Sequence, residues 1–182
     1  MLLFLRTSIA ILACSVLTSA DSTPFTITAS STNSTLNGMH AYINDPANEF
    51  DAVLLFTSDP TIAPTNFTLD NSGGHLLAHT PYTPLPLLEA NTNNDAYDET
   101  VLFSSPAYVA LGQNPPLCHE YSNYISCVVT SEGMTRLSKL YVCPAGIGYD
   151  TFRDGGALKI GNAVPTGCLA VQLNFTNCVG QC

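Results

Sequence analysis

The chain has 182 residues, a length that fits one ordinary domain. Acidic residues outnumber Lys and Arg by 14 to 5, which gives a formal net charge of −9. Such a surface repels the phosphates of nucleic acids and the headgroups of anionic lipids, so we expect neither as a partner.

The first 20 residues are predicted to be a secretory signal peptide. A short apolar stretch over 9–17 follows Arg6, and the small residues Thr18, Ser19 and Ala20 stand where a signal peptidase would cut. The stretch is shorter than the ~20 apolar residues that span a bilayer, and no second segment is long and apolar enough to do so. We therefore expect residues 21–182 to form a single secreted domain without a membrane span.

The cysteines favour disulfides over metal binding. Seven occur, and removal of the signal with Cys14 leaves six, all between Cys118 and Cys182. An even number in an oxidising compartment predicts three disulfides, among many alternative pairings. There is no C-x-x-C pair to suggest zinc, and we expect no cofactor.

Three N-glycosylation sequons begin at Asn33, Asn66 and Asn174. Together with a signal peptide they predict a eukaryotic secreted glycoprotein. Asn174 is the sequon that we most expect to be skipped, because it lies among strand residues close to two cysteines.

The predicted elements are almost all short strands. Apolar and polar residues alternate over 25–29, and further strands are predicted over 36–43 (with Gly38 as a bulge) and 52–57. Two apolar runs, 67–69 and 75–78, flank the turn residues 71–74 and predict a hairpin. Prolines make 80–86 a loop or edge segment, and 91–98 is predicted to be an exposed turn-rich segment. Later strands are predicted over 100–103, 108–111, 124–130, 137–142, 157–160 and 169–173. About ten strands without a long helix predict an all-β single domain, an antiparallel β-sandwich or barrel.

No residue pattern identifies a catalytic or metal site. His75 and His79 lie four apart, on one face of a strand, and His40 or Asp70 would be a third ligand, but no further spacing supports a metal. A glycosidase would need two facing carboxyls, for instance Asp98 or Glu99 with Glu120 or Asp150, and sequence alone does not pair them. There is no Gly-x-Ser-x-Gly elbow for a serine hydrolase. We predict that the protein is not an enzyme, with a small secreted hydrolase as the alternative.

Tyrosines offer a further interpretation, an aromatic platform for sugars. Tyr121, Tyr124, Tyr141 and Tyr149 are spread through the cysteine-containing part of the chain, and tryptophan is absent. Packing of half-buried tyrosines in the core is the competing interpretation.

The layout resembles small secreted fungal cell-wall glycoproteins of the phialide-associated (PhiA-like) group. The shared features are Phe25-Thr26-Ile27-Thr28-Ala29-Ser30 directly after the signal, Phe67-Thr68-Leu69 with a Gly74-His75-Leu76 return, Tyr141-Val142-Cys143-Pro144, a turn at Gly161, and Gly167-Cys168-Leu169-Ala170-Val171-Gln172-Leu173. The proline-rich segment 80–86 and the additional cysteines depart from that pattern.

The resemblance implies a disulfide between Cys143 and Cys168 and a structural glycoprotein of the cell wall. Cys118 and Cys127 would then form a local hairpin disulfide and leave Cys178 to pair with Cys182, although crossed pairings remain open. We therefore expect a noncatalytic secreted cell-wall or surface glycoprotein with a structural or host-contact role. The alternative is a secreted carbohydrate-binding module or effector. The expected partners are cell-wall polysaccharide or an extracellular protein.

Overall fold

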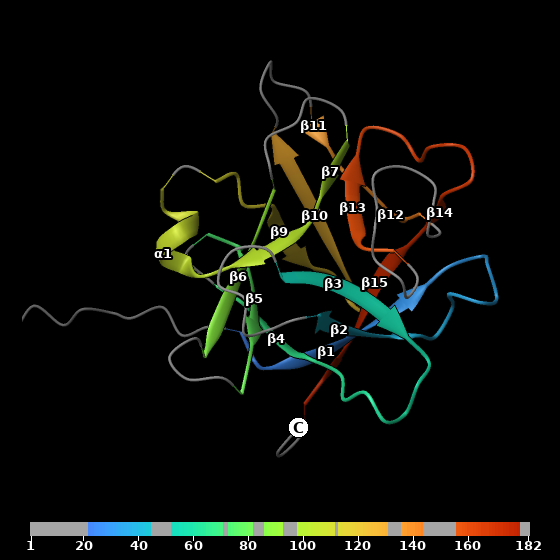
Figure 1. Ribbon diagram of the computed structural model, residues 1–182, viewed down its shortest axis with the longest axis horizontal. Helices are drawn as coiled ribbons and strands as arrows, with labels where there is room; N and C mark the ends of the chain where they lie inside the picture. Colours follow the sequence, from blue (N-terminus) through green and yellow to red (C-terminus); the bar gives the residue numbers. More distant parts are fainter. Residues whose placement is uncertain are drawn as a thin grey trace, which may run out of the picture.

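The computed structural model describes residues 22–44, 52–70, 73–81, 86–92, 98–111, 113–130, 136–143 and 156–178. Nearly all the elements in these residues are strands, which form two antiparallel sheets (Figure 1). The strands are β1 (Phe25–Ser30), β2 (His40–Asn44), β3 (Ala52–Thr57), β4 (Asn66–Leu69), β5 (Leu76–His79), β6 (Leu87–Asn91), β7 (Asp98–Thr100), β8 (Leu102–Ser104), β9 (Leu117–Glu120), β10 (Tyr124–Thr130), β11 (Arg136–Leu137), β12 (Lys139–Val142), β13 (Leu158–Gly161), β14 (Leu169–Ala170) and β15 (Gln172–Asn177). One short helix, α1 (Pro106–Val109), completes the described elements. The prediction of an all-β barrel or sandwich is confirmed.

Seven strands of the described part close into an antiparallel barrel. Pairing runs from β1 through β2, β3, β8, β6, β5 and β4 and returns to β1. The closure is possible because β1 uses one edge twice: Thr28 pairs with β2, and Phe25 and Thr26 pair with β4. The other edge of β1 pairs along its whole length with β15. A ribbon of β10, β9 and β11 continues the sheet beyond β15.

The second sheet has the order β14-β12-β13-β7 in the described residues. Its inward side chains join the hydrophobic cluster that fills the barrel, so the two sheets share one core. The barrel contributes three phenylalanines that contact one another in a row. The stacked rings of Phe25 and Phe67 have centroids 6.4 Å apart, and the tilted rings of Phe67 and Phe103 have centroids 6.1 Å apart. The interior of the barrel is therefore a packed core.

The chain changes sheets at three places within the described residues. Val101 separates β7 from β8, Ser138 separates β11 from β12, and Val171 separates β14 from β15. Each of these residues donates a backbone hydrogen bond to the small sheet, to Leu158, Gly161 and Leu140 respectively. At these corners a single residue carries the chain from one sheet to the other, which links the two sheets. Each of the single strands predicted over 100–103, 137–142 and 169–173 therefore covers parts of two strands, which belong to different sheets.

Several sequence predictions hold and several are corrected. The strands over 52–57 and 124–130 occur with the predicted bounds, and 67–69 and 75–78 form the predicted hairpin. The strand predicted over 36–43 begins only at His40, because Gly38 has a left-handed φ of 84° and ends a turn. The segment 80–86 has only Thr80, Pro81 and Pro86 among the described residues.

Two predictions over polar or mixed segments are wrong. Residues 108–111 belong to α1 and the turn after it, because Pro106 occupies the start of a helix, where its missing N–H costs nothing. Asn91 and Thr92 are buried at 1% and 0% exposure, although 91–98 was expected to be exposed; 93–97 lie outside the described residues. The strands β6 and β9 were not predicted at all.

Two disulfides crosslink the described C-terminal part of the chain. Cys118 bonds to Cys127 and Cys143 to Cys168, the pairings given by the hairpin argument and by the resemblance. Cys178 is also disulfide-bonded, but Cys182 lies outside the described residues, so their pairing stays a prediction. Among the described helices none is long and apolar enough to cross a membrane.

Candidate functional site

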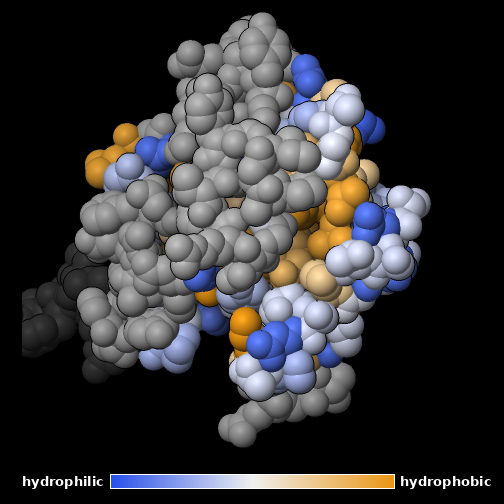
Figure 2. Space-filling model, turned by 45° about the vertical axis from the view of Figure 1, so that its right-hand side comes forward, coloured by the Kyte–Doolittle hydropathy of each residue, from blue (hydrophilic) through white to orange (hydrophobic). Residues whose placement is uncertain are grey.

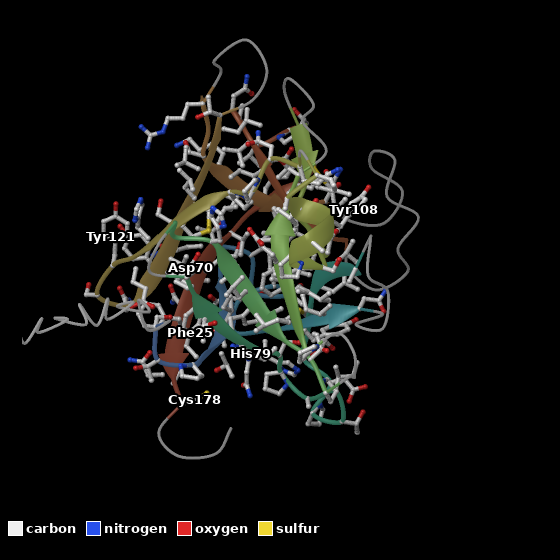
Figure 3. The ribbon with its side chains drawn as sticks, turned by 90° about the vertical axis from the view of Figure 1, so that its left-hand side faces the viewer. Phe25, Asp70, His79, Tyr108, Tyr121 and Cys178 are labelled. Atoms are coloured by element: carbon white, nitrogen blue, oxygen red, sulfur yellow. A yellow bond between two sulfur atoms is a disulfide. The ribbon has the colours of Figure 1, made fainter. Side chains whose placement is uncertain are left out.

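The hairpin of β9 and β10 presents two tyrosines at its tip. Tyr121 donates its backbone N–H to the carbonyl of Tyr124 at 2.8 Å, which closes the turn. The two rings stack nearly parallel, with centroids 4.9 Å apart and an interplanar angle of 9°. Tyr121 is 49% exposed and lies at the edge of the molecule (Figure 3). The hairpin therefore offers an exposed aromatic surface to a ligand.

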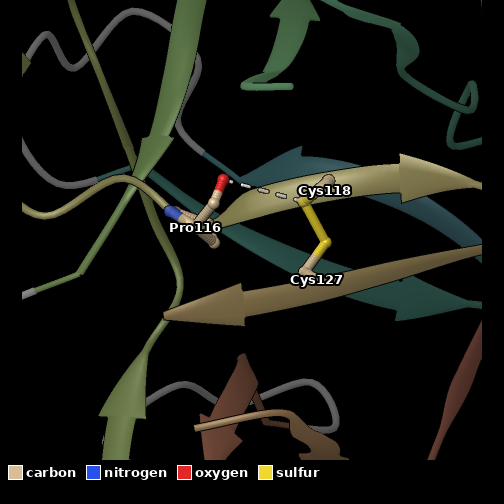
Figure 4. Close-up of a disulfide and its surroundings, with 3 residues drawn as sticks. All are labelled: Pro116, Cys118 and Cys127. Atoms are coloured by element: carbon tan, nitrogen blue, oxygen red, sulfur yellow. Dashed lines mark hydrogen bonds between the residues drawn. A yellow bond between two sulfur atoms is a disulfide. The ribbon is translucent and has the colours of Figure 1, made fainter. Parts of the chain in front are cut away.

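The disulfide between Cys118 and Cys127 holds this hairpin in register. The two cysteines face each other directly across β9 and β10, three residue pairs from the tyrosine turn (Figure 4). The backbone N–H of Cys118 also donates to the carbonyl of Gly74 at 2.7 Å, which ties β9 to the turn before β5. Because the register is fixed, the position of Tyr121 relative to the barrel is fixed as well.

A shallow, mostly uncharged groove continues from the tyrosine pair along the sheet. The alternation of strand residues places Tyr124 and Ser126 of β10 on the outer face, opposite the buried Ile125 and Cys127. A depression of about 220 Å³ lies on this face, and a second of about 410 Å³ adjoins it through the shared residues 170–172. The first is lined by Tyr124, Ile125, Ser126, Ser138, Lys139, Leu140, Val164, Ala170, Val171 and Gln172, and the second adds Ser30, Ser31 and Thr32. We call the tyrosine pair and these two depressions the tyrosine face.

The lining of the tyrosine face suits a neutral polar polymer. Hydroxyl and amide side chains both donate and accept hydrogen bonds, and tyrosine rings give apolar contact area with a polar tip. Lys139 is the one charged side chain among the residues that line the two depressions. Gln172 and Ser30 were not singled out from sequence, although the alternation of polar and apolar residues in 25–30 and 169–173 contained the signal.

The other two predicted platform tyrosines do not join this face. Tyr141 is completely buried on β12, so the interpretation of that residue as part of a sugar platform is wrong. Its position on a strand covered on both sides explains the burial, since three of the four β12 residues are buried. Tyr149 lies outside the described residues.

The histidines considered as metal ligands are not brought together in the described residues. His40 Nε2 donates to the carbonyl of Ile62 at 2.7 Å, and His79 Nε2 lies 3.0 Å from the hydroxyl of Thr68. His75 Nδ1 lies 2.6 Å from a carboxylate oxygen of Glu89. Each imidazole therefore has a different neighbour, and no group of three metal-ligating side chains occurs among the described residues.

His75, directly before β5, and Glu89 of β6 form a close polar contact. Burial raises the pKa of Glu89, and the nearby charge of Asp70 adds to this, while the charge and hydrogen bond of His75 act in the opposite direction. The Nε2 atom of His75 faces Gly73, where an added Cβ would lie 2.9 Å away. The pair thus fixes the turn between β4 and β5 against β6.

The carboxylates considered as a glycosidase pair lie in different sheets. Asp98 and Glu99 belong to β7 of the small sheet, and Glu120 belongs to β9 of the large one. Glu120 borders a cavity of about 390 Å³ between β9 and the turn before β5, which Asp70, His119 and Ser22 also line. Asp150 lies outside the described residues.

The three sequon asparagines lie in three different environments. Asn33 lies in a surface turn, where its Oδ1 accepts a hydrogen bond from the backbone of Thr35 at 2.9 Å. Asn66 begins β4 and lines a groove. Asn174 lies between β1 and β10 on the central strand β15, opposite Thr28 on one side and Tyr124 on the other, and its Oδ1 is buried without a partner. Glycosylation itself stays a prediction at each site.

No family model, no curated protein and no solved structure matches this chain. The fold and the surfaces described above are therefore the basis on which a function can be argued.

Proposed function

We propose that the protein is a noncatalytic, secreted glycoprotein of a cell wall or cell surface, with a structural or host-contact role. The observation that carries the proposal is the presence of disulfides across neighbouring strands, Cys118 with Cys127 and Cys143 with Cys168. Disulfides form and persist in oxidising compartments and are rare in the cytosol. This supports export, and with it the use of the sequons as sugar acceptors.

The packed core leaves the outer surface of the described barrel as the place where a ligand or partner would bind. Side chains fill the barrel, and the largest fully buried ones include Phe25, Phe67, Phe103, Leu54 and Leu88. Barrels that bind small ligands keep an interior cavity, whereas this interior is occupied by the protein itself. The resemblance to phialide-associated wall glycoproteins agrees with this proposal and remains a hypothesis.

The test is expression of the full chain in a fungal secretory host. We expect secretion into the medium, a mature N-terminus near Asp21, sugar on at least one sequon, and no free thiols on nonreducing peptide mapping. An intracellular protein with an uncleaved leader and free sulfhydryls would refute the proposal. Cleavage of wall polysaccharides by the purified protein would refute the proposal that the protein is noncatalytic.

The tyrosine face favours a second candidate, binding of a neutral wall polysaccharide. The exposed Tyr121 ring, stacked on Tyr124, supports this reading because sugar rings pack their apolar faces on aromatic side chains. The partners to test are insoluble β-glucan and chitin.

The substitution Tyr121→Ala removes the exposed ring, and we expect it to weaken retention on the bound polysaccharide about fivefold, since an aromatic contact contributes ~1 kcal/mol. Tyr121→Phe keeps the ring and should keep most of the retention. Leu111→Ala is the matched control, because Leu111 is 82% exposed after α1, away from the hairpin. Equal retention of wild type and Tyr121→Ala on every polysaccharide would exclude this candidate.

A further inference from the structure

We infer that an N-linked glycan on Asn66 folds back onto the protein and packs its first sugars into the groove beside that residue. The inference rests on the proposed function, because it requires the chain to pass through a glycosylating secretory pathway. It adds a defined site to that proposal, a groove that is filled by the glycan on Asn66, one of the residues that line it.

The groove is large and mostly apolar. Its volume is about 770 Å³, within the range of pockets that hold small ligands. The lining residues are Thr26, Tyr42, Ile43, Ile62, Ala63, Pro64, Thr65, Asn66, His79, Thr80 and Pro81. Figure 2 shows exposed hydrophobic surface on one face of this chain, between hydrophilic residues at the right of the view and the residues drawn in grey.

The groove is preformed, because its wall over 59–65 is bonded to the barrel. His40 Nε2 donates to the carbonyl of Ile62, and the Thr65 N–H donates to the carbonyl of Ala41 at 3.1 Å. The Thr65 hydroxyl accepts from the N–H of Ile43 at 2.9 Å. A ligand that enters this groove therefore does not have to order the wall that it contacts, which lowers the entropic cost of binding.

The start of the same segment is fixed by Asp59. Its carboxylate accepts hydrogen bonds from the N–H and the hydroxyl of Thr61, at 2.9 and 2.8 Å. These bonds hold the pKa of Asp59 below its usual range, so the carboxylate stays ionised and the turn stays closed in mildly acidic surroundings.

The side chain of Asn66 is placed to project a sugar into this groove. Asn66 pairs with Thr26 on β1 and with His79 on β5, so the three side chains share the outer face of the barrel and all line the groove. The Oδ1 atom of Asn66 lies 3.9 Å from the sulfur of Cys178. Nδ2, the atom that would carry the glycan, is the other terminal atom of this side chain, which lines the groove.

The chemistry of the first sugar matches the groove. An N-acetylglucosamine unit has an apolar ring face and an acetamide methyl, which suit Ile62, Pro64 and Pro81. Its hydroxyls and amide need hydrogen-bond partners, which the lining hydroxyls of Thr26 and Thr65 can supply. Burial of the apolar wall under a covalently attached ligand would stabilise the folded protein at high effective concentration.

The test compares glycan removal at two sites in the secreted protein. Asn66→Gln removes the groove sugar, and Asn33→Gln removes a sugar from a surface turn as the matched control. We expect Asn66→Gln to lower Tm by about 3 °C or more and to increase binding of an apolar dye, and Asn33→Gln to change neither. The wild type and the same two variants are also made without glycosylation, in an oxidising bacterial host. The change in Tm that each substitution causes there is subtracted from the change measured in the secreted glycoprotein.

Two further measurements make the test specific to the groove. Trimming with an endoglycosidase that leaves one N-acetylglucosamine should keep the Tm of the intact glycoprotein, whereas complete removal should lower it. Ile62→Ala, which removes apolar wall, should shrink the difference in Tm between glycosylated and unglycosylated protein.

The outcomes separate this inference from the proposed function. If mass spectrometry finds Asn66 glycosylated and the corrected Tm of Asn66→Gln equals that of wild type, the inference is wrong while the glycoprotein proposal stands. The same holds if Asn33 is occupied and Asn66 is not. A chain with free thiols and no sugar at any sequon would overturn both.

Discussion

The turn between β4 and β5 allows a prediction with a built-in control. Gly74 has a φ of 72°, in the left-handed region, and a Cβ added there would lie 2.7 Å from the carbonyl oxygen of Cys118. Gly38 has a similar φ of 84°, but an added Cβ would meet nothing within 4 Å. Substitution of either residue by alanine therefore imposes the same kind of backbone strain, while only Gly74→Ala adds a clash.

The expected free energies follow from these contacts. The left-handed backbone costs alanine about 1 kcal/mol relative to glycine, which is the whole expected effect of Gly38→Ala. At Gly74 the clash requires β9 to move by the 0.7 Å between 2.7 Å and the 3.4 Å at which ordinary contact begins. That movement weakens the 2.7 Å hydrogen bond from the Cys118 N–H to the Gly74 carbonyl and the bridge between His75 and Leu117, at about 1 kcal/mol each. We expect Gly74→Ala to cost about 3 kcal/mol in the free energy of unfolding.

The assay is thermal and urea unfolding of the two variants with their disulfides intact. For a domain of this size 1 kcal/mol shifts Tm by about 3 °C, so Gly38→Ala should lower Tm by about 3 °C and Gly74→Ala by about 9 °C. Hydrogen exchange at the Cys118 amide should accelerate in Gly74→Ala alone. Equal losses of stability in the two variants would refute the reasoning, because they would show that the contact with β9 adds no cost to Gly74→Ala.

Two more predictions concern charge and crosslinks. Because burial raises the pKa of Glu89 in the folded state, the fold favours its protonated form; its contribution to stability is complete below the unfolded pKa and is lost as pH rises through the folded one. The free energy of unfolding of wild type should therefore fall with rising pH relative to Glu89→Gln, in urea titrations over about pH 4–7, and a pH-independent difference would contradict this assignment. Replacement of both Cys143 and Cys168 by alanine should cost about 3.5 kcal/mol, because that disulfide spans 25 residues, and replacement of both Cys118 and Cys127 about 2.6 kcal/mol for a span of 9. Calorimetry of the two double variants checks this order, and a larger loss from the shorter loop would oppose the chain-entropy explanation.

Local patterns in the sequence determined the fold class and many of the elements. Strands over 52–57 and 124–130 are specified by dense β-branched and aromatic residues between turn residues, and the glycines at 73–74 specify the hairpin of β4 and β5. The short helix at Pro106 was missed because Tyr108, Val109 and Leu111 also fit a strand, and the proline decided the local geometry.

The candidate surfaces were predictable only in part. The sequence singled out Tyr121 and Tyr124 as candidates, but also Tyr141, which is buried in the core. Composition cannot separate a surface tyrosine from a core one, because both roles use the same apolar ring. The sequon at Asn66 was recognisable, whereas the groove beside it was not, since its walls come from strands and loops that are distant in sequence.

What the sequence determined by itself was the type of structure: short amphipathic strands, an oxidised C-terminal part, an acidic surface and a predicted export signal. These depend on neighbouring residues and on composition, which a linear chain displays directly. The closure of the barrel at β1 and the change of sheet at Val101, Ser138 and Val171 became apparent only in the folded protein. Those features depend on which strand edges meet across the core, and the alternation of residues along a strand fixes which face is buried but does not specify its neighbour.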